Sequence, residues 1–218
     1  MEAPVARRPL KVRQKTWPRT VAAALVRYNL TPNSISVASA AVSLVGAVFL
    51  VAAERWGGVG EAIFFVLAAV CIQLRLLCNL LDGLMAVEGG LKTKTGEIFN
   101  EFPDRIADVI LFVAAGYSIA LDVRGSVELG YLCAITSLIT AYVRAFGGAL
   151  GFAQDYCGPM AKQQRMAILT LACVLSAAET LAGFSHRLMW LALLVILVGS
   201  ILTIARRTLR IAKLLNAR

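Results

Sequence analysis

Six long apolar runs take up most of the sequence and constrain its fold more than any other feature. They cover residues 35–53, 62–86, 98–121, 129–150, 166–184 and 188–205. Each is close to the ~20 residues with which a helix crosses the ~30 Å hydrocarbon core of a bilayer. Helices are expected, because an open strand would leave backbone groups without hydrogen-bond partners in lipid. The sequence therefore predicts an all-α integral membrane protein with six transmembrane helices.

The composition supports this class and argues against others. Hydrophobic residues make up 59% of the 218 residues, and the formal net charge is +9. Basic charge on so apolar a chain indicates a cytoplasmic membrane surface with its lipids, or phosphate-bearing ligands. No stripe of aromatic and basic residues indicates nucleic acid as a partner. The five cysteines form no C-x-x-C pair, so we expect buried thiols rather than disulfides or zinc ligands.

Lysine and arginine alternate between the loops. The N-terminal arm, the loops after the second and fourth runs, and the C-terminal tail are basic, whereas the other three loops hold only Arg55, Arg124 and Arg187. Basic loops stay in the cytoplasm, so both termini and the loop between the second and third runs are expected there, at a bacterial-type inner membrane. The basic N-terminus is not expected to be a cleavable signal peptide.

Three segments follow from this pattern. Residues 1–34 are expected to form a basic arm and a cytoplasmic amphipathic surface helix, in which Trp17, Val21, Leu25 and Tyr28 share one face. Residues 35–205 are expected to form the six-helix transmembrane catalytic domain. Residues 206–218 are expected to form a basic cytoplasmic tail.

Polar residues gather where the second and third runs approach their shared cytoplasmic loop. One helical stripe holds Asn79, Asp82 and Ala86, and a second holds Asn100, Asp104 and Asp108. Polar groups inside membrane helices are costly and therefore candidates for function. Oxygen ligands of this kind suit Mg²⁺ or Mn²⁺. The alternative, polar helix ends at the membrane interface, does not explain two stripes in phase on either side of a glycine-containing turn.

The central motif resembles the signature of the CDP-alcohol phosphotransferases (CDP-alcohol phosphatidyltransferases). Their pattern is D-x-x-D-G-x-x-A-R, about eight residues, then G-x-x-x-D-x-x-x-D. The stretches "DGLMA" and "NEFPDRIADVI" follow its spacing. The stretches "TPNSIS", "AYVRAFG" and "GPMAKQQRMAIL" are also similar to the family, so the resemblance covers nearly the whole chain.

The resemblance implies a phosphotransferase of phospholipid biosynthesis. It would move a phosphatidyl group from a CDP-linked donor, CDP-diacylglycerol, to a small alcohol acceptor with or without a phosphate of its own, and release CMP. One or two Mg²⁺ or Mn²⁺ ions and a homodimer are implied as well. The implied metal ligands are Asp82, Asp104, Asn79 and Asn100, with Asp104 also as the general base. The implied nucleotide-binding residues are Gly83, Ala86 and Gly96.

Three positions depart from the family pattern. Asn79 and Asn100 replace aspartates, and Val87 replaces the arginine. An asparagine carbonyl can ligate a hard cation but brings no negative charge, so we expect weaker metal binding or a single ion. Nearby residues that could compensate are Asp108, Glu97, Glu101 and Arg75. The departures motivate an alternative function, a catalytically impaired family member that binds nucleotide or lipid as a regulatory or assembly protein. A small transporter is a weaker alternative, because nothing indicates inverted repeats.

Basic residues near the cytoplasmic ends of the fourth and fifth runs form the last group. Arg144, Lys162 and Arg165 are expected to bind the phosphate of the acceptor or donor. The alternative is that they follow the positive-inside rule and reach toward lipid headgroups.

Overall fold

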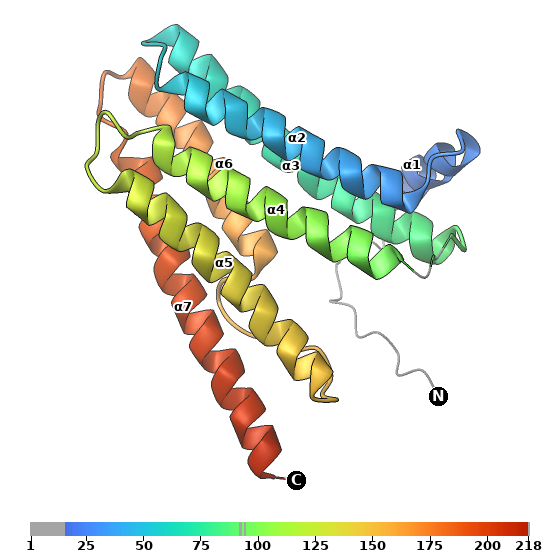
Figure 1. Ribbon diagram of the computed structural model, residues 1–218. Coiled ribbons are helices and arrows are strands. Elements are labelled where there is room, and N and C mark those ends of the chain that lie inside the picture. The colour runs from blue at the N-terminus through green and yellow to red at the C-terminus, as the bar shows by residue number, and fades with distance from the viewer. Residues whose placement is uncertain (1–15, 92, 94, 218) are drawn as a thin grey trace.

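The computed structural model describes residues 16–91, 93 and 95–217 as a bundle of α-helices, with no strand among them (Figure 1). The helices are α1 (Thr16–Arg27), α2 (Pro32–Ala53), α3 (Val59–Glu88), α4 (Gly96–Tyr117), α5 (Ser126–Ala149), α6 (Lys162–Leu181) and α7 (Arg187–Asn216). The all-α prediction is confirmed, and α2 to α7 overlap the six apolar runs. The predicted arm over 1–15 and the loop lysines Lys92 and Lys94 lie outside the described residues.

Five of these helices could cross a membrane by length and composition. They are α2, α3, α5, α6 and α7, among the residues that the structure describes. Helix α4 is too charged to qualify in the same way, because five charged residues lie along it: Glu97, Glu101, Asp104, Arg105 and Asp108. The helix is nevertheless packed inside the bundle, against α2 and α5. Five candidate spans therefore support an integral membrane protein. Whether α4 can be a sixth span depends on which residues neutralise its charges.

The first turn of α2 begins where the sequence provides a cap. The Thr31 hydroxyl accepts a hydrogen bond from the Ser34 backbone, and the Ser34 hydroxyl accepts one from the Thr31 backbone. Pro32 occupies the first turn, where its missing N–H costs nothing. This capping box separates α2 from α1, whose buried Ala22 packs beside Leu81 of α3. The cap thus fixes where the chain turns from α1 into α2.

Close backbone contact joins α4 to α5. A Cβ on Gly116 would lie 2.6 Å from the Ser126 carbonyl oxygen and 3.1 Å from the Cα of Gly130. Small residues allow such approach, which is a main source of helix association where apolar burial gives little advantage over lipid. Along the bundle axis the core is filled by large side chains such as Leu50, Phe65 and Leu111.

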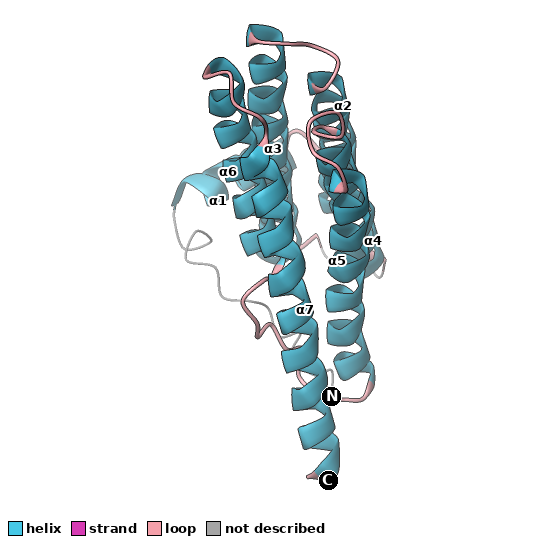
Figure 2. Ribbon diagram, turned by 90° about the vertical axis from the view of Figure 1, so that its left-hand side faces the viewer, coloured by secondary structure: helices cyan, strands magenta, loops and turns pink. Residues whose placement is uncertain are grey.

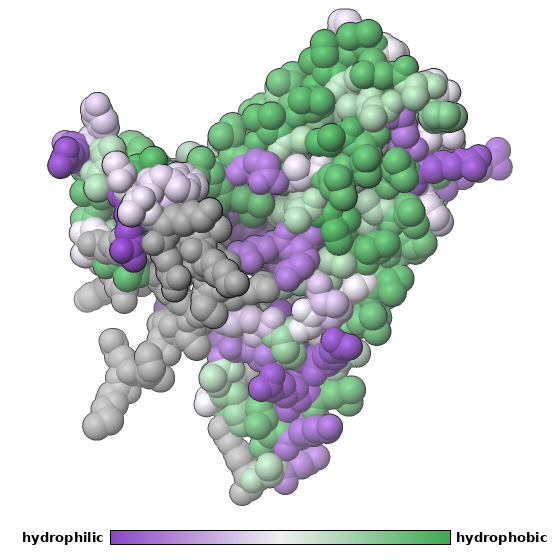
Figure 3. All heavy atoms as spheres, turned by 180° about the vertical axis from the view of Figure 1, so that it is seen from behind, coloured by the Kyte–Doolittle hydropathy of each residue, from purple (hydrophilic) through white to green (hydrophobic). Residues whose placement is uncertain are grey.

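Apolar side chains also cover much of the outside. Large exposed examples include Leu44 and Val48 on α2, Val66 on α3, and Val195 and Val198 on α7. Figure 3 shows hydrophobic residues spread over one face of the molecule, with hydrophilic residues concentrated in other parts of it. Such continuous apolar surface is expected where helices contact lipid.

The helix α7 continues without a break to Asn216. Residues 206–216, expected as a basic cytoplasmic tail, are helical and continuous with the last apolar run, and α7 projects beyond the other helices in two views (Figures 1 and 2). No proline or glycine interrupts this stretch, so the helical hydrogen bonds continue through its basic residues.

Candidate functional site

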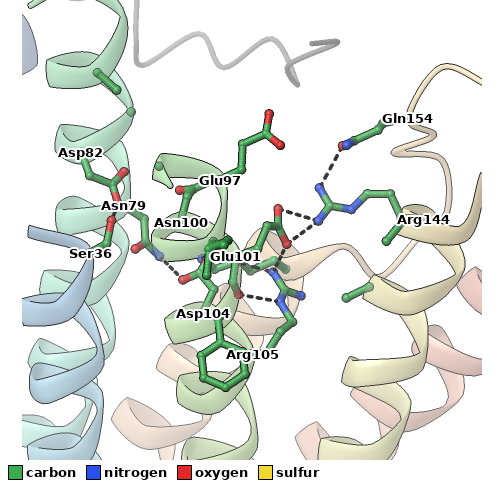
Figure 4. Close-up of a pocket in the computed structure, with 18 of the residues that line it drawn as sticks. Ser36, Asn79, Asp82, Glu97, Asn100, Glu101, Asp104, Arg105, Arg144 and Gln154 are labelled. Carbon is green, nitrogen blue, oxygen red and sulfur yellow. Dashed lines mark hydrogen bonds and ion pairs between the residues drawn. The ribbon is translucent and has the colours of Figure 1, made fainter. Parts of the chain in front are cut away.

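A cavity of about 1170 Å³ opens in the bundle near the loop that joins α3 to α4. The structure brings most of the predicted site residues into its lining. These are Asn79, Asp82, Gly83, Ala86, Gly96, Glu97, Asn100, Glu101, Asp104, Arg144, Lys162 and Arg165. They come from α3, α4, α5 and α6, and Figure 4 shows α3 and α5 on either side of α4.

The two predicted stripes meet at this cavity, except for Asp108, which lies outside its lining. Asp82 and Asn79 are held from α2, because Ser36 Oγ donates to Asp82 Oδ2 at 2.6 Å and Ser39 Oγ donates to Asn79 Oδ1 at 2.9 Å. Asn79 then reaches α4, where its Nδ2 donates to Asp104 Oδ1 at 2.8 Å (Figure 4). Two serines of α2 thus fix the orientation of the polar groups on α3.

One carboxylate oxygen in the cavity has no hydrogen-bond partner. Asp82 is 3% exposed, and its Oδ1 is buried without a hydrogen bond in the structure. A buried carboxylate oxygen without a donor is unfavourable, so this atom is the one that a cation or a ligand donor would satisfy. The unpartnered Oδ1 is more direct support for Asp82 as a metal ligand than its spacing in the sequence.

Asp104 differs, because both of its oxygens have partners. Its Oδ1 accepts from Asn79, and its Oδ2 forms an ion pair with the ammonium group of Lys162 on α6. Among the described residues, no three His, Cys, Asp or Glu side chains lie together as a metal site would require. The candidate metal site therefore consists of two carboxylates plus amide oxygens, with Lys162 supplying a positive charge beside one of them.

The two asparagines suit oxygen ligation in different ways. Asn100 is exposed at the cavity lining. Asn79 directs its nitrogen at Asp104, but the oxygen and nitrogen of an amide are assigned from their hydrogen bonds. Because the Ser39 hydroxyl can donate or accept, a flipped Asn79 amide keeps that bond and turns its oxygen toward Asp104. The donor set therefore fits a divalent cation such as Mg²⁺ or Mn²⁺.

A buried cluster of charges lies next to the cavity. Asp108 accepts from Arg75 Nη2 at 2.5 Å and from Arg165 Nη2 at 3.0 Å, and all three residues are 2% exposed or less. Neither Arg75 nor Asp108 lines the cavity. These two predicted compensating residues thus bind each other and hold α3, α4 and α6 together. The cluster also neutralises the most deeply buried charge of α4.

The fourth run contributes a second charged contact. Arg144 Nη2 lies 2.7 Å from both Glu101 Oε1 and Glu101 Oε2 (Figure 4). Its guanidinium also lies over the ring of Tyr156, at 5.4 Å, and Nη1 lies 3.5 Å from Gln154 Oε1. Glu101, predicted only as a compensating carboxylate, is thus the partner of a predicted phosphate-binding arginine.

Several residues that line the cavity or hold its lining in place were missed from the sequence. Ser36 and Ser39 are spaced three apart on one face of the first run, a signal that could have been used. Arg207 is 4% exposed and donates to the carbonyl oxygens of Cys157 and Thr140 at 2.9 and 2.8 Å. It lies in the segment predicted as a tail, where nothing in the sequence distinguishes it from its solvent-exposed neighbours.

Comparison with known proteins gives relatives over most of the chain. A scan of the sequence against models of protein families finds no match. The phosphatidylinositol phosphate synthase of Mycolicibacterium smegmatis is 30% identical over 194 residues, which cover 87% of this chain and 81% of that protein. The membrane protein YnbA of Escherichia coli is 26% identical over 147 residues, 67% of this chain and 68% of that protein.

Solved structures share the fold. The phosphatidylinositol phosphate synthase of Mycobacterium tuberculosis with CDP-DAG bound gives a TM-score of 0.71 at 24% identity, covering 89% of this chain and 92% of that one. The same enzyme in complex with manganese and citrate also gives 0.71 at 24% identity, covering 89% of this chain and 88% of that one.

Proposed function

The chain belongs to the CDP-alcohol phosphotransferase family, and on that premise we propose that it transfers a phosphatidyl group from CDP-diacylglycerol to a small alcohol, with release of CMP. Two relatives support the donor and the reaction. The one from Mycobacterium tuberculosis has a solved structure with CDP-DAG bound, and the one from Mycolicibacterium smegmatis is named a phosphatidylinositol phosphate synthase. The observation that carries the proposal is the buried, unpartnered Oδ1 of Asp82 in a large cavity shared by α3 and α4.

The proposed metal ligands are Asp82, Asp104, Asn79 and Asn100. The relative solved with manganese supports Mg²⁺ or Mn²⁺ as the cofactor. When bound, such an ion would neutralise the pyrophosphate of the donor and the charge on departing CMP. The uncovered Asp82 oxygen and the amide oxygens suit a hard cation, and the low number of carboxylates suits one ion better than two.

The chain's own residues would perform the remaining steps. The acceptor oxygen bonds to the phosphorus next to the lipid, and the bond from that phosphorus to CMP breaks. Asp104 takes the proton of the acceptor hydroxyl, with Asn79 and Lys162 fixing its orientation. The small residues Gly83, Ala86 and Gly96 line the cavity and would let the nucleotide approach the backbone.

We place the cavity at the cytoplasmic side of a six-span protein. The alternation of basic loops supports this orientation, and the ion pairs of Asp108 make α4 acceptable as the sixth span. The amphipathic helix α1 would lie on the cytoplasmic surface, because its apolar residues Trp17 and Val21 are 47% and 38% exposed. A homodimer is proposed from the family alone.

The proposal is tested by CMP release. Purified protein in detergent with CDP-diacylglycerol, a panel of small alcohols and Mg²⁺ or Mn²⁺ should release CMP with at least one acceptor, and chelation of the metal should stop the release. Stoichiometric phospholipid product should appear with the CMP. Absence of CMP with every acceptor and both metals would contradict the proposed activity.

A second candidate is a family member without catalysis that binds nucleotide or lipid as a regulatory or assembly protein. The observation in its favour is that both oxygens of Asp104 are already engaged, one by Asn79 and one by Lys162. Such a protein would bind CDP-diacylglycerol but release no CMP.

Restoring the two aspartates separates these candidates. We expect the wild type to bind one Mn²⁺ per chain in calorimetry or electron paramagnetic resonance. The Asn79→Asp, Asn100→Asp double variant should bind a second ion, because two more carboxylates face the cavity. Activity that appears only in the double variant would indicate a decayed site. Activity that falls in the double variant would indicate a site adapted to asparagine. A wild type that binds two ions would contradict the single-ion expectation.

A further inference from the structure

Glu101 occupies the face of Arg144 that would otherwise bind an anionic group of a substrate. Both carboxylate oxygens lie 2.7 Å from Arg144 Nη2, and Arg105 Nη2 lies 3.4 Å from Glu101 Oε2. The Arg144 side chain is 14% exposed and that of Glu101 46% exposed. The carboxylate therefore lies at the cavity surface, and the arginine lies largely behind it.

The rest of the Arg144 guanidinium is engaged as well. One flat face lies over Tyr156, and Nη1 lies near Gln154 Oε1, which also accepts a hydrogen bond from the Tyr156 hydroxyl at 3.0 Å. An incoming phosphate that binds at Nη2 of this arginine would displace Glu101. The displaced carboxylate would remain in the same cavity as a second negative charge.

The other cations of the cavity lining offer no easy alternative. Lys162 pairs with Asp104, and Arg165 pairs with Asp108. Arg207 donates to two backbone carbonyls, and Arg105 lies against Glu101 and Asp104. Among the described residues, each lysine or arginine that lines the cavity thus already has a partner within the chain. A phosphate dianion would have to break at least one of these contacts, which are partly or fully buried.

We infer that Glu101 is a specificity-determining residue that makes the acceptor site select a small uncharged polyol over a phosphorylated one. This inference rests on the proposed transferase function. Hydroxyl groups can donate to the exposed oxygens of Glu101 and bond to the amides of Asn100 and Gln154, which line the same cavity. A phosphate of the acceptor would face the Glu101 carboxylate. Some relatives are named phosphatidylinositol phosphate synthases. The product in that name carries a phosphate in addition to the one that joins the lipid to inositol. This chain would select a different acceptor.

Matched acceptor pairs test the inference. CMP release is measured with inositol against inositol 1-phosphate, and with glycerol against glycerol 3-phosphate, at saturating CDP-diacylglycerol and Mg²⁺. The wild type should favour the uncharged member of the pair that it uses. Glu101→Gln should shift kcat/KM by about tenfold toward the phosphorylated member, because the repelling charge is gone and Arg144 is freed. Glu128→Gln, which removes the same charge from an exposed carboxylate at the start of α5 outside the cavity lining, should leave the preference unchanged.

Binding gives a second readout that does not need turnover. Calorimetry with glycerol 3-phosphate and with inorganic phosphate should detect binding to the Glu101→Gln protein and markedly weaker binding to the wild type. A wild type that prefers the phosphorylated acceptor, or a preference and phosphate affinity unchanged by Glu101→Gln, would overturn the inference. Absence of CMP release in every protein would count against the proposed activity, while the phosphate-binding comparison would still decide the role of Glu101.

Discussion

Asp104→Ala should lower CMP release by about 10²–10⁴-fold, the range over which positioned acid–base groups act. The expected effect is at the upper end, because Asp104 has two proposed roles: it takes the proton of the acceptor and it ligates the cation. Asp104→Asn should be similarly inactive although it keeps the shape of the side chain and can still accept from Asn79. The measurement is the rate of CMP release from CDP-diacylglycerol with the best acceptor.

Two controls make this result specific. Glu128→Ala removes an exposed carboxylate at the start of α5, far along the chain from the motif, and should keep wild-type turnover. The Asp104 variants should remain inserted and monodisperse with an unchanged helical circular dichroism spectrum. Turnover near the wild-type rate in folded Asp104→Asn would rule out Asp104 as the general base.

Asp108→Ala should lower the free energy of unfolding by about 3–5 kcal/mol, the usual effect of removing one partner from a buried ion pair. The substitution removes the carboxylate between Arg75 and Arg165, which are 0% and 2% exposed, and leaves Arg75 with only the longer 3.6 Å ion pair to Asp104. Thermal unfolding in detergent, followed by circular dichroism, measures the change.

An exposed arginine–aspartate pair provides the comparison. Arg210 lies 3.4 Å from Asp155, and the arginine side chain is 61% exposed. Arg210→Ala should therefore change the stability by about 1 kcal/mol or less. If Asp108→Ala and Arg210→Ala lowered the free energy of unfolding equally, the Asp108 cluster would stabilise the protein no more than an exposed ion pair does.

The sequence was sufficient for the helices and for the two motif stripes. The apolar runs predicted the helices α2 to α7, and five of these, all but α4, are long and apolar enough to span a membrane without reference to partners. The spacing of Asn79 and Asp82, and of Asn100 and Asp104, put them in one cavity because helical periodicity is local.

Contacts between distant segments could not be predicted. Glu101 and Arg144 are 43 residues apart, and Lys162 lies 58 residues from Asp104. Which cation meets which carboxylate depends on the packing and rotation of whole helices. Arg75 shows the same limit, because its place two turns from Asp82 made it a candidate to replace the missing arginine of the motif, whereas the structure pairs it with Asp108 in the bundle interior.

The Asp108 cluster also bears on how this chain enters a membrane during synthesis. A single charge in the middle of a helix adds about 2.5–3.5 kcal/mol to the free energy of insertion. Arg75, Asp108 and Arg165 place one such charge on each of α3, α4 and α6, and α4 by itself is not apolar enough to be taken as a span. We therefore expect α4 to leave the insertion machinery together with α3 rather than alone. Within that pair Arg75 already balances Asp108, and Arg165 adds its own contact to Asp108 only when α6 arrives, so the cluster stays incomplete until three helices have met.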